Sequence, residues 1–215
     1  NIYSNVVNCN FINNEAIAHN LNNSHGGAGC VRAGITYQNC KFINNSADQG
    51  GALTYHASGN IKDCFFINNS AKLYGGALST GYIDMDMNLK VANCNFEQNN
   101  APYGGAVQLK GKNIEIQKST FNKNVASVNG GAVNIIAKTV TIDDVDFNKN
   151  IANVNGGAVY INGYKTTVVD SSFIANEAIP DVKKLDDGLG GAIYINSSAA
   201  TINKNTFNNN VARNG

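Results

Sequence analysis

The chain repeats one phrase eight times, and this repeat constrains the fold more than any other feature. Each copy has a phenylalanine, an asparagine three residues later and an alanine five residues later. The phenylalanines are Phe11, Phe42, Phe66, Phe96, Phe121, Phe147, Phe173 and Phe207. The asparagines are Asn14, Asn45, Asn69, Asn99, Asn124, Asn150, Asn176 and Asn210. The alanines are Ala16, Ala47, Ala71, Ala101, Ala126, Ala152, Ala178 and Ala212.

The spacing of the copies favours β-structure over helix. A Gly-Gly-Ala step follows seven of the copies, and the period is 24 to 26 residues where nothing is inserted. Helical solenoids need about 33 to 47 residues per unit, and long 3.6-residue periodicity is missing here. Each unit alternates apolar and polar residues instead, as at Val133/Ile135, Val140/Ile142 and Val145/Phe147. We therefore predict three short strands per coil in an all-β parallel β-helix of about eight coils, forming a single domain over residues 1–215.

Stacked coils turn each repeated position into a column along the rod. Adjacent coils lie about 4.8 Å apart, so eight coils would make a rod of roughly 38 Å. The phenylalanines then form an offset-stacked core ladder, and the asparagines form a hydrogen-bonded amide ladder at a turn. Gly-Gly allows a tight bend at another turn. The repeated phrase is therefore predicted to be scaffold.

The composition limits the classes of binding partner that we expect. Charged residues make up 14% of the chain and balance to a net +1, so neither nucleic acid nor an anionic membrane surface is an expected partner. No apolar run approaches the roughly 18 to 20 residues that cross a bilayer, so we expect no direct membrane insertion. Regularly spaced hydrophobic residues, 43% of the total, argue against disorder. No signal peptide is recognisable, and we expect an export signal and an anchor outside this piece of chain.

Four of the five cysteines occupy one column, two residues before the phenylalanine. They are Cys9, Cys40, Cys64 and Cys94, and the column continues as Ser119, Val145, Ser171 and Asn205. We predict an inward column of small side chains with free thiols, and an outward-facing Cys30. Paired C-x-x-C spacing is missing, so zinc is not expected, and no cofactor or other metal is expected either.

An enzyme must be weighed because parallel β-helices include polysaccharide lyases and hydrolases. Asp144 and Asp170 share a column and would lie about one rung apart, close to the roughly 5 Å of a retaining glycosidase pair. Lys118 and Lys204 flank them in the same column. Opposite charges on neighbouring strands stabilise each other, so we interpret the column as a surface charge ladder with no catalytic residues.

A second charge pair is expected one column over, where Lys90 and Glu115 become neighbours. The remaining ionisable candidates are histidines. His19 and His25 lie in the first insertion, while His56 is isolated in the sequence.

Insertions mark the candidate binding residues, because solenoid insertions form loops on one face. The insertions at about 17–25 and 177–188 both lie between the repeated alanine and Gly-Gly, so their loops should project from the same edge of the rod. The insertion at about 81–88 follows Gly-Gly-Ala, so its loop should project from a different edge. Outward tyrosines could also stack on sugars. The candidate binding residues are His19, Asn22, His25, Tyr160, Tyr194, Lys183, Lys184, Asp186 and Asp187.

The repeat resembles known surface proteins. The phrases "NCKFINNSADQGGAL" at 39–53 and "DCFFINNSAKLYGGAL" at 63–78 resemble the repeats of chlamydial polymorphic outer-membrane proteins. They look still more like the adhesin-like surface proteins of methanogenic archaea. The resemblance implies a right-handed parallel β-helix, pectate-lyase-like in type, displayed outside the cell and used in attachment. It carries over no catalytic or ligand residue.

The sequence therefore favours an extracellular, cell-surface adhesin-like domain that attaches to a glycan or protein of another cell. Two alternatives stay open at this point. One is a polysaccharide lyase or hydrolase of pectate-lyase-like type, and the other is a passive structural stalk whose recognition lies elsewhere in the parent protein.

Overall fold

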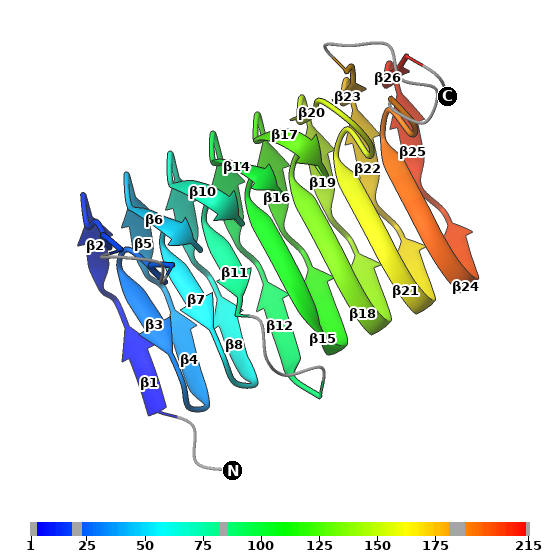
Figure 1. The fold of residues 1–215 in the computed structure, drawn as a ribbon. Coiled ribbons are helices and arrows are strands. Elements are labelled where there is room, and N and C mark those ends of the chain that lie inside the picture. The colour runs from blue at the N-terminus through cyan, green and yellow to red at the C-terminus, as the bar shows by residue number, and fades with distance from the viewer. Residues whose placement is uncertain (1–3, 19–22, 82–85, 181–187, 214–215) are drawn as a thin grey trace.

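The protein is a parallel β-solenoid. A computed structural model describes residues 4–18, 23–81, 86–180 and 188–213. The described residues contain strands, turns and bends without a helix, and they make about six turns of the solenoid. Figure 1 shows the coils stacked into a rod with the two termini at opposite ends. Within the described residues, no helix of membrane-spanning length and hydropathy occurs.

Three parallel sheets run along the rod. The phenylalanine sheet has eight strands: β2 (Asn10–Ile12), β5 (Lys41–Ile43), β9 (Phe65–Ile67), β13 (Asn95–Glu97), β16 (Thr120–Asn122), β19 (Asp146–Asn148), β22 (Ser172–Ile174) and β25 (Thr206–Asn208). The alanine sheet has seven: β6 (Ser46–Gln49), β10 (Ser70–Tyr74), β14 (Asn100–Tyr103), β17 (Val125–Asn129), β20 (Ile151–Ala152), β23 (Glu177–Ala178) and β26 (Val211–Ala212).

The long sheet has eleven strands and forms the rest of each coil. Its shorter strands are β1 (Ser4–Val7), β3 (Gly29–Val31), β4 (Ile35–Gln38), β7 (Leu53–Tyr55), β8 (Gly59–Lys62), β11 (Leu78–Thr80) and β12 (Asn88–Ala92). Its longer strands are β15 (Val107–Gln117), β18 (Val133–Asp143), β21 (Val159–Val169) and β24 (Ile193–Asn203).

The prediction of three short strands in every coil is wrong for the later coils. From β15 onward, the two expected strands on this side merge into one strand of 11 residues. In β18, Val133 and Ile135 before the centre and Val140 and Ile142 after it are all buried. The small Ala137 pairs with Gly111 near the centre. A Cβ on Gly111 would lie 2.7 Å from the Met87 carbonyl oxygen. Backbone pairing therefore continues through a position that the sequence pattern marks as a break.

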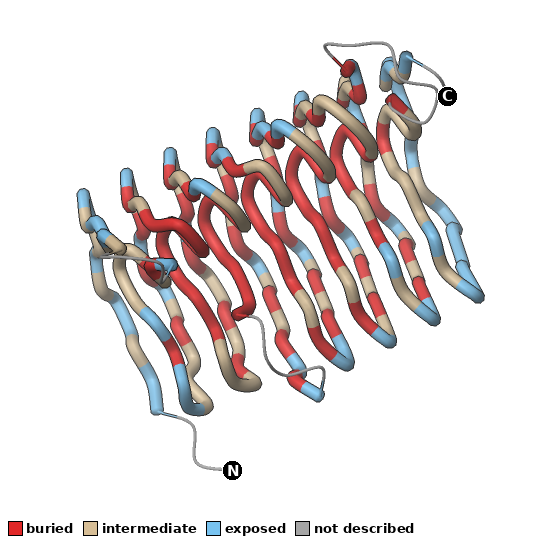
Figure 2. The backbone as a smooth tube through the Cα atoms, in the orientation of Figure 1, coloured by how far each residue is buried: buried red, intermediate tan, exposed pale blue. Residues whose placement is uncertain are grey.

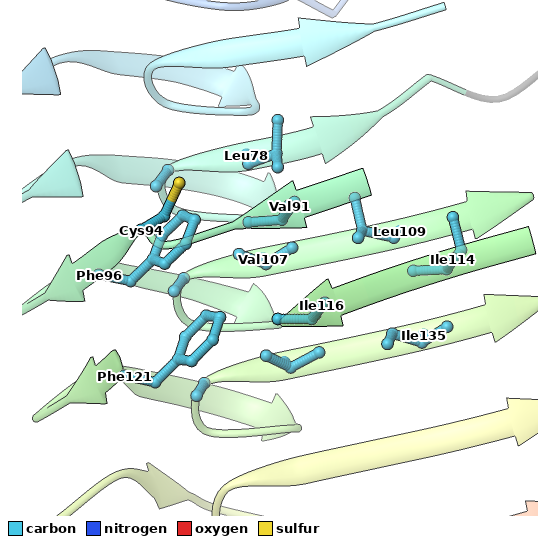
Figure 3. Close-up of a cluster of buried hydrophobic side chains, with 14 of the residues drawn as sticks. Leu78, Val91, Cys94, Phe96, Val107, Leu109, Ile114, Ile116, Phe121 and Ile135 are labelled. Carbon is cyan, nitrogen blue, oxygen red and sulfur yellow. The ribbon is translucent and has the colours of Figure 1, made fainter. Parts of the chain in front are cut away.

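The phenylalanine ladder forms the spine of the core. Phe96 and Phe121 face the same interior as Val107 and Ile116 (Figure 3). Successive rings from Phe11 to Phe207 stack with centroids 4.6 to 5.1 Å apart and planes within 13° of parallel. Six of the eight rings are fully buried. Figure 2 shows this buried interior continuing from coil to coil, so each coil depends on its neighbours for its core.

The asparagine ladder satisfies buried polar groups at the corner between the phenylalanine and alanine sheets. The six asparagines from Asn45 to Asn176 are completely buried. Asn99, for example, donates its side-chain amide to Asn124 Oδ1 at 3.0 Å and to the Phe66 carbonyl at 2.9 Å. Its own Oδ1 accepts from the Asn69 side chain at 3.0 Å. A buried amide must be hydrogen-bonded, and this geometry repeats at each coil.

Left-handed backbone conformations make the corners. The residue three positions before each phenylalanine has a positive φ, as does the residue two positions after it. The third corner uses glycine: Gly130 has φ 67°. A Cβ on the following Gly131 would lie 2.0 Å from the Gly157 carbonyl oxygen of the next coil. Only glycine therefore lets the coils approach each other at this corner.

All five cysteines are free thiols. Cys40, Cys64 and Cys94 are buried, as their inward column predicts, and Cys30 is exposed. The Cys94 thiol donates a hydrogen bond to the Ala92 carbonyl at 3.2 Å. One coil later, the Ser119 hydroxyl donates to the Gln117 carbonyl at 2.7 Å. Burial raises the pKa of the Cys94 thiol well above its usual value. These thiols are structural donors at a corner.

Candidate functional site

Two adjoining hollows form a trough on the outer face of the phenylalanine sheet. They have volumes of about 290 and 380 Å³ and share Asn95 and Thr120. The first hollow is lined by Asn39, Asp63, Cys64, Phe65, Asn93, Cys94, Asn95, Lys118 and Thr120. The second is lined by Asn95, Glu97, Thr120, Phe121, Asn122, Asp146, Asn148, Ser172 and Ile174. We call this surface the trough; it follows β9, β13, β16, β19 and β22 along the rod.

Strand alternation places the side chains of the trough. The phenylalanine of each strand points into the core, so its two neighbours point outward. The residues before the phenylalanine pair in register from Asn95 to Thr120, Asp146 and Ser172. Those after it pair from Glu97 through the next three strands to Ile174. Each rung of the trough therefore presents two outward side chains.

Hydrogen bonds link neighbouring rungs of the trough. The Thr120 hydroxyl donates to Asn95 Oδ1 at 3.2 Å, and the Ser172 hydroxyl donates to a carboxylate oxygen of Asp146. Asn148 is different, because its Oδ1 is buried without a hydrogen-bond partner among the described residues. Hydrogen bonds therefore hold some polar groups of the trough in place, while Asn148 Oδ1 is shielded from the surface.

The charge of the trough is mainly negative. Asp63, Glu97 and Asp146 line it together with a single amine, Lys118. Within the described part of the chain, the ion pairs lie elsewhere: Lys72 with Asp48, Lys90 with Glu115, and Lys138 with Asp86. The carboxylates of the trough therefore remain uncompensated by salt bridges.

Phe65 gives one end of the trough an aromatic surface. It is the ninth phenylalanine and lies outside the buried ladder, with 41% of its surface exposed. Ile67, on the same strand and the same face, and Ile43, its partner on β5, lie beside it as half-buried neighbours. Sequence reasoning missed Phe65, although the doublet Phe65-Phe66 signals it: adjacent strand residues face opposite sides, so one ring must point outward.

The structure places three of the predicted binding residues outside the trough. Tyr160 and Tyr194 are paired in register on the long sheet, with rings stacked at 4.9 Å. Both are half-buried, and burial raises the pKa of Tyr160. His25 lies at the glycine corner. The other six predicted residues lie outside the described residues: His19, Asn22, Lys183, Lys184, Asp186 and Asp187.

His56 is not isolated in the fold, which corrects the sequence interpretation. Its ring contacts that of His25 edge to face, with centroids 5.1 Å apart. Burial, followed by the positive charge of Arg32, lowers the pKa of His25; burial and the His25 charge lower that of His56. His25 Nδ1 and His56 Nε2 are buried without partners in the described part of the chain. No group of three metal-ligating side chains forms among the described residues.

The expected charge ladder at Asp144 and Asp170 does not form ion pairs. Both carboxylates lie at exposed corners with positive φ. Neither contacts Lys118 or Lys204 within the 4 Å of an ion pair in the described chain, because exposed pairs gain little over hydrated side chains. The predicted neighbours Lys90 and Glu115 do pair, with Nζ and Oε1 3.1 Å apart.

The columns that build this solenoid also carry its likeness to known proteins. Two stretches match a family model. They match the Chlamydia polymorphic membrane protein repeat, at residues 63–81 and 144–162. Each contains the scaffold phrase and one end of the trough falls within the first stretch. The likeness to archaeal adhesin-like proteins stays a prediction. No curated protein and no solved structure matches the chain.

Proposed function

We propose that this chain is a cell-surface, adhesin-like β-helix domain that attaches to a glycan or protein of another cell. The observation that carries the proposal is the trough, a continuous polar surface with an aromatic end on a rigid rod. Binding sites are concave and combine apolar surface with a few placed polar groups. The proposal includes a right-handed coil, about eight coils in all and a pectate-lyase-like type of solenoid.

The surface location rests on the membrane protein repeat matched at two places. A parallel β-solenoid carrying such repeats fits the exported part of an outer-membrane or surface protein. The export signal and anchor belong to the parent protein in this proposal.

We propose binding without bond cleavage. Asp144 and Asp170 lie at exposed corners and belong to neither hollow of the trough. General acid–base catalysis by carboxylates needs two positioned groups beside the scissile bond. The trough instead offers carboxylates that support hydrogen bonding to a bound partner.

The test is retention of the purified chain on microbial cells, host cells and immobilised polysaccharides. Thr120→Arg places a long cation where the two hollows meet, and should reduce retention at least tenfold. Asn162→Arg, at an exposed position on the long sheet, is the matched control and should bind as the parent does. Equal retention by both variants would refute a role for the trough, and no retention of the parent chain on any of these surfaces would favour a passive stalk. Sugars released into the supernatant would show an enzyme.

A further inference from the structure

We infer that the trough takes an extended chain of uncharged sugar rings, running along the rod axis, with one ring packed on Phe65. This inference rests on the proposed function, because it names the partner class of the same surface. The spacing, the hydrogen-bonding capacity, the charge and the aromatic end of the trough support it.

The spacing of the rungs suits a linear glycan. Parallel strands lie about 4.8 Å apart, close to the length of one pyranose unit in an extended chain. The trough repeats the same geometry from β13 to β22, with in-register outward side chains at each step. A polymer aligned with the rod can therefore make a similar contact at each successive ring.

The polar groups of the trough suit hydroxyl partners. Asn95, Asn122 and Asn148 offer both donors and acceptors, as sugar hydroxyls do. Asn122 and Asn148 lie in register on neighbouring strands, so successive rungs present the same kind of side chain. Asp146 accepts one hydrogen bond from Ser172, which leaves lone pairs free.

The charge of the trough selects against acidic glycans. Asp63, Glu97 and Asp146 would repel uronate or sulfate groups. Two amines oppose them: Lys118 lines the first hollow, and Lys41 is in register with Phe65 at the aromatic end. Bidentate recognition of carboxylate or sulfate uses arginine, which is missing from the lining residues of both hollows. An uncharged chain avoids this repulsion and uses the carboxylates as acceptors.

Phe65 provides the apolar contact that sugar recognition needs. Its ring is 41% exposed at the end of a polar surface and lies beside the half-buried Ile67, so the two side chains together offer an apolar surface. One face of a pyranose ring carries C–H groups that pack on an aromatic ring. Phe65 therefore sets one end of the bound chain, and the amides of β13, β16 and β19 hold its hydroxyls.

The experiment measures the affinity of the full chain for four hexasaccharide probes. The uncharged probes are β-1,4-linked glucose and β-1,4-linked mannose, the acidic probe is hexagalacturonate, and the cationic probe is the glucosamine hexamer. We expect at least one uncharged hexamer to bind at least tenfold more tightly than either charged one. Phe65→Ala should weaken that binding at least tenfold, while Tyr164→Ala, which removes a more exposed ring on the long sheet, should leave it unchanged.

A second variant tests the charge argument by a gain of binding. Glu97→Lys should raise the affinity for hexagalacturonate at least fivefold and lower the selectivity for uncharged probes. Tighter binding of a charged hexamer by the parent chain, no binding of any uncharged probe, or no effect of Phe65→Ala would overturn the inference. The proposed function would survive those results if Thr120→Arg still reduced retention on cells at least tenfold, and would fail if it did not.

Discussion

Asn99 and Asn124 are joined by two hydrogen bonds to one oxygen. The backbone N–H and the side-chain amide of Asn99 each donate to Asn124 Oδ1 at 3.0 Å. The backbone N–H and the side-chain amide of Asn124 in turn donate to Asn150 Oδ1, both at 3.0 Å. The ladder therefore links each coil to the next through buried hydrogen bonds. If one partner is removed, water cannot reach the other to replace the lost bond.

Asn124→Ala should lower the free energy of unfolding by about 3 kcal/mol, because each buried donor left unpaired costs about 1 to 3 kcal/mol. Urea unfolding followed by circular dichroism would measure it. Asn162→Ala, at an exposed position, should change the value by less than about 0.5 kcal/mol. Similar effects of the two substitutions would contradict a stabilising ladder.

Ala175→Gly should stabilise the protein by about 0.5 to 1 kcal/mol. Ala175 has φ 52°, and a left-handed conformation costs a residue with a Cβ about 1 to 2 kcal/mol, partly offset by the flexibility of glycine in the unfolded chain. Ala199→Gly, in the interior of β24, should instead destabilise the protein. The two midpoints of thermal unfolding should move in opposite directions; a fall in both would rule out relief of backbone strain.

The stability should decrease as the pH is lowered from about 6.5. The pKa values of His25 and His56 lie below their ordinary value of 6.5, so the unfolded chain takes up these protons first. Above pH 6.5 the two neutral histidines make their full contribution to the free energy of unfolding. This contribution is lost as the pH falls toward their lowered pKa values. Arg32 strengthens the effect and Asp48, ion-paired with Lys72, opposes it at His25.

Urea midpoints at pH 8 and pH 5.5 check this expectation. The parent chain should lose stability between the two, and His56→Gln should lose less, because one titrating imidazole is gone. An unchanged pH dependence in His56→Gln would place the effect elsewhere.

Thiol labelling should separate the cysteines by burial. Cys30 is exposed and should react rapidly with a thiol reagent in the folded protein. Cys40, Cys64 and Cys94 are buried and should react only on unfolding, and burial also raises the pKa values of Cys40 and Cys94, which disfavours the reactive thiolate. Cys30→Ser should remove the fastest phase, and Cys9, which is half-buried, should react at an intermediate rate. A fast phase that persists when Cys9 and Cys30 are both replaced by serine would mean that a buried thiol is accessible.

The sequence by itself determined the scaffold. Eight regularly spaced phenylalanines and asparagines require a stack in which equal positions become columns, so the ring ladder, the amide ladder and the glycine corner could be derived before any coordinates. The pairing of Lys90 with Glu115 followed from the same register. These features depend on the spacing of residues along the chain, and that spacing can be read directly from the repeat.

Only the tertiary structure decided the outer surface. Which outward columns adjoin to form the trough, how Phe65 becomes its aromatic end, and how His25 meets His56 all depend on the curvature of each corner. Hydration and side-chain entropy decided that Asp144 stays apart from Lys118. Core packing between repeated positions does not fix the exposed side chains. Their arrangement therefore follows from the shape of the folded surface and not from the spacing of residues.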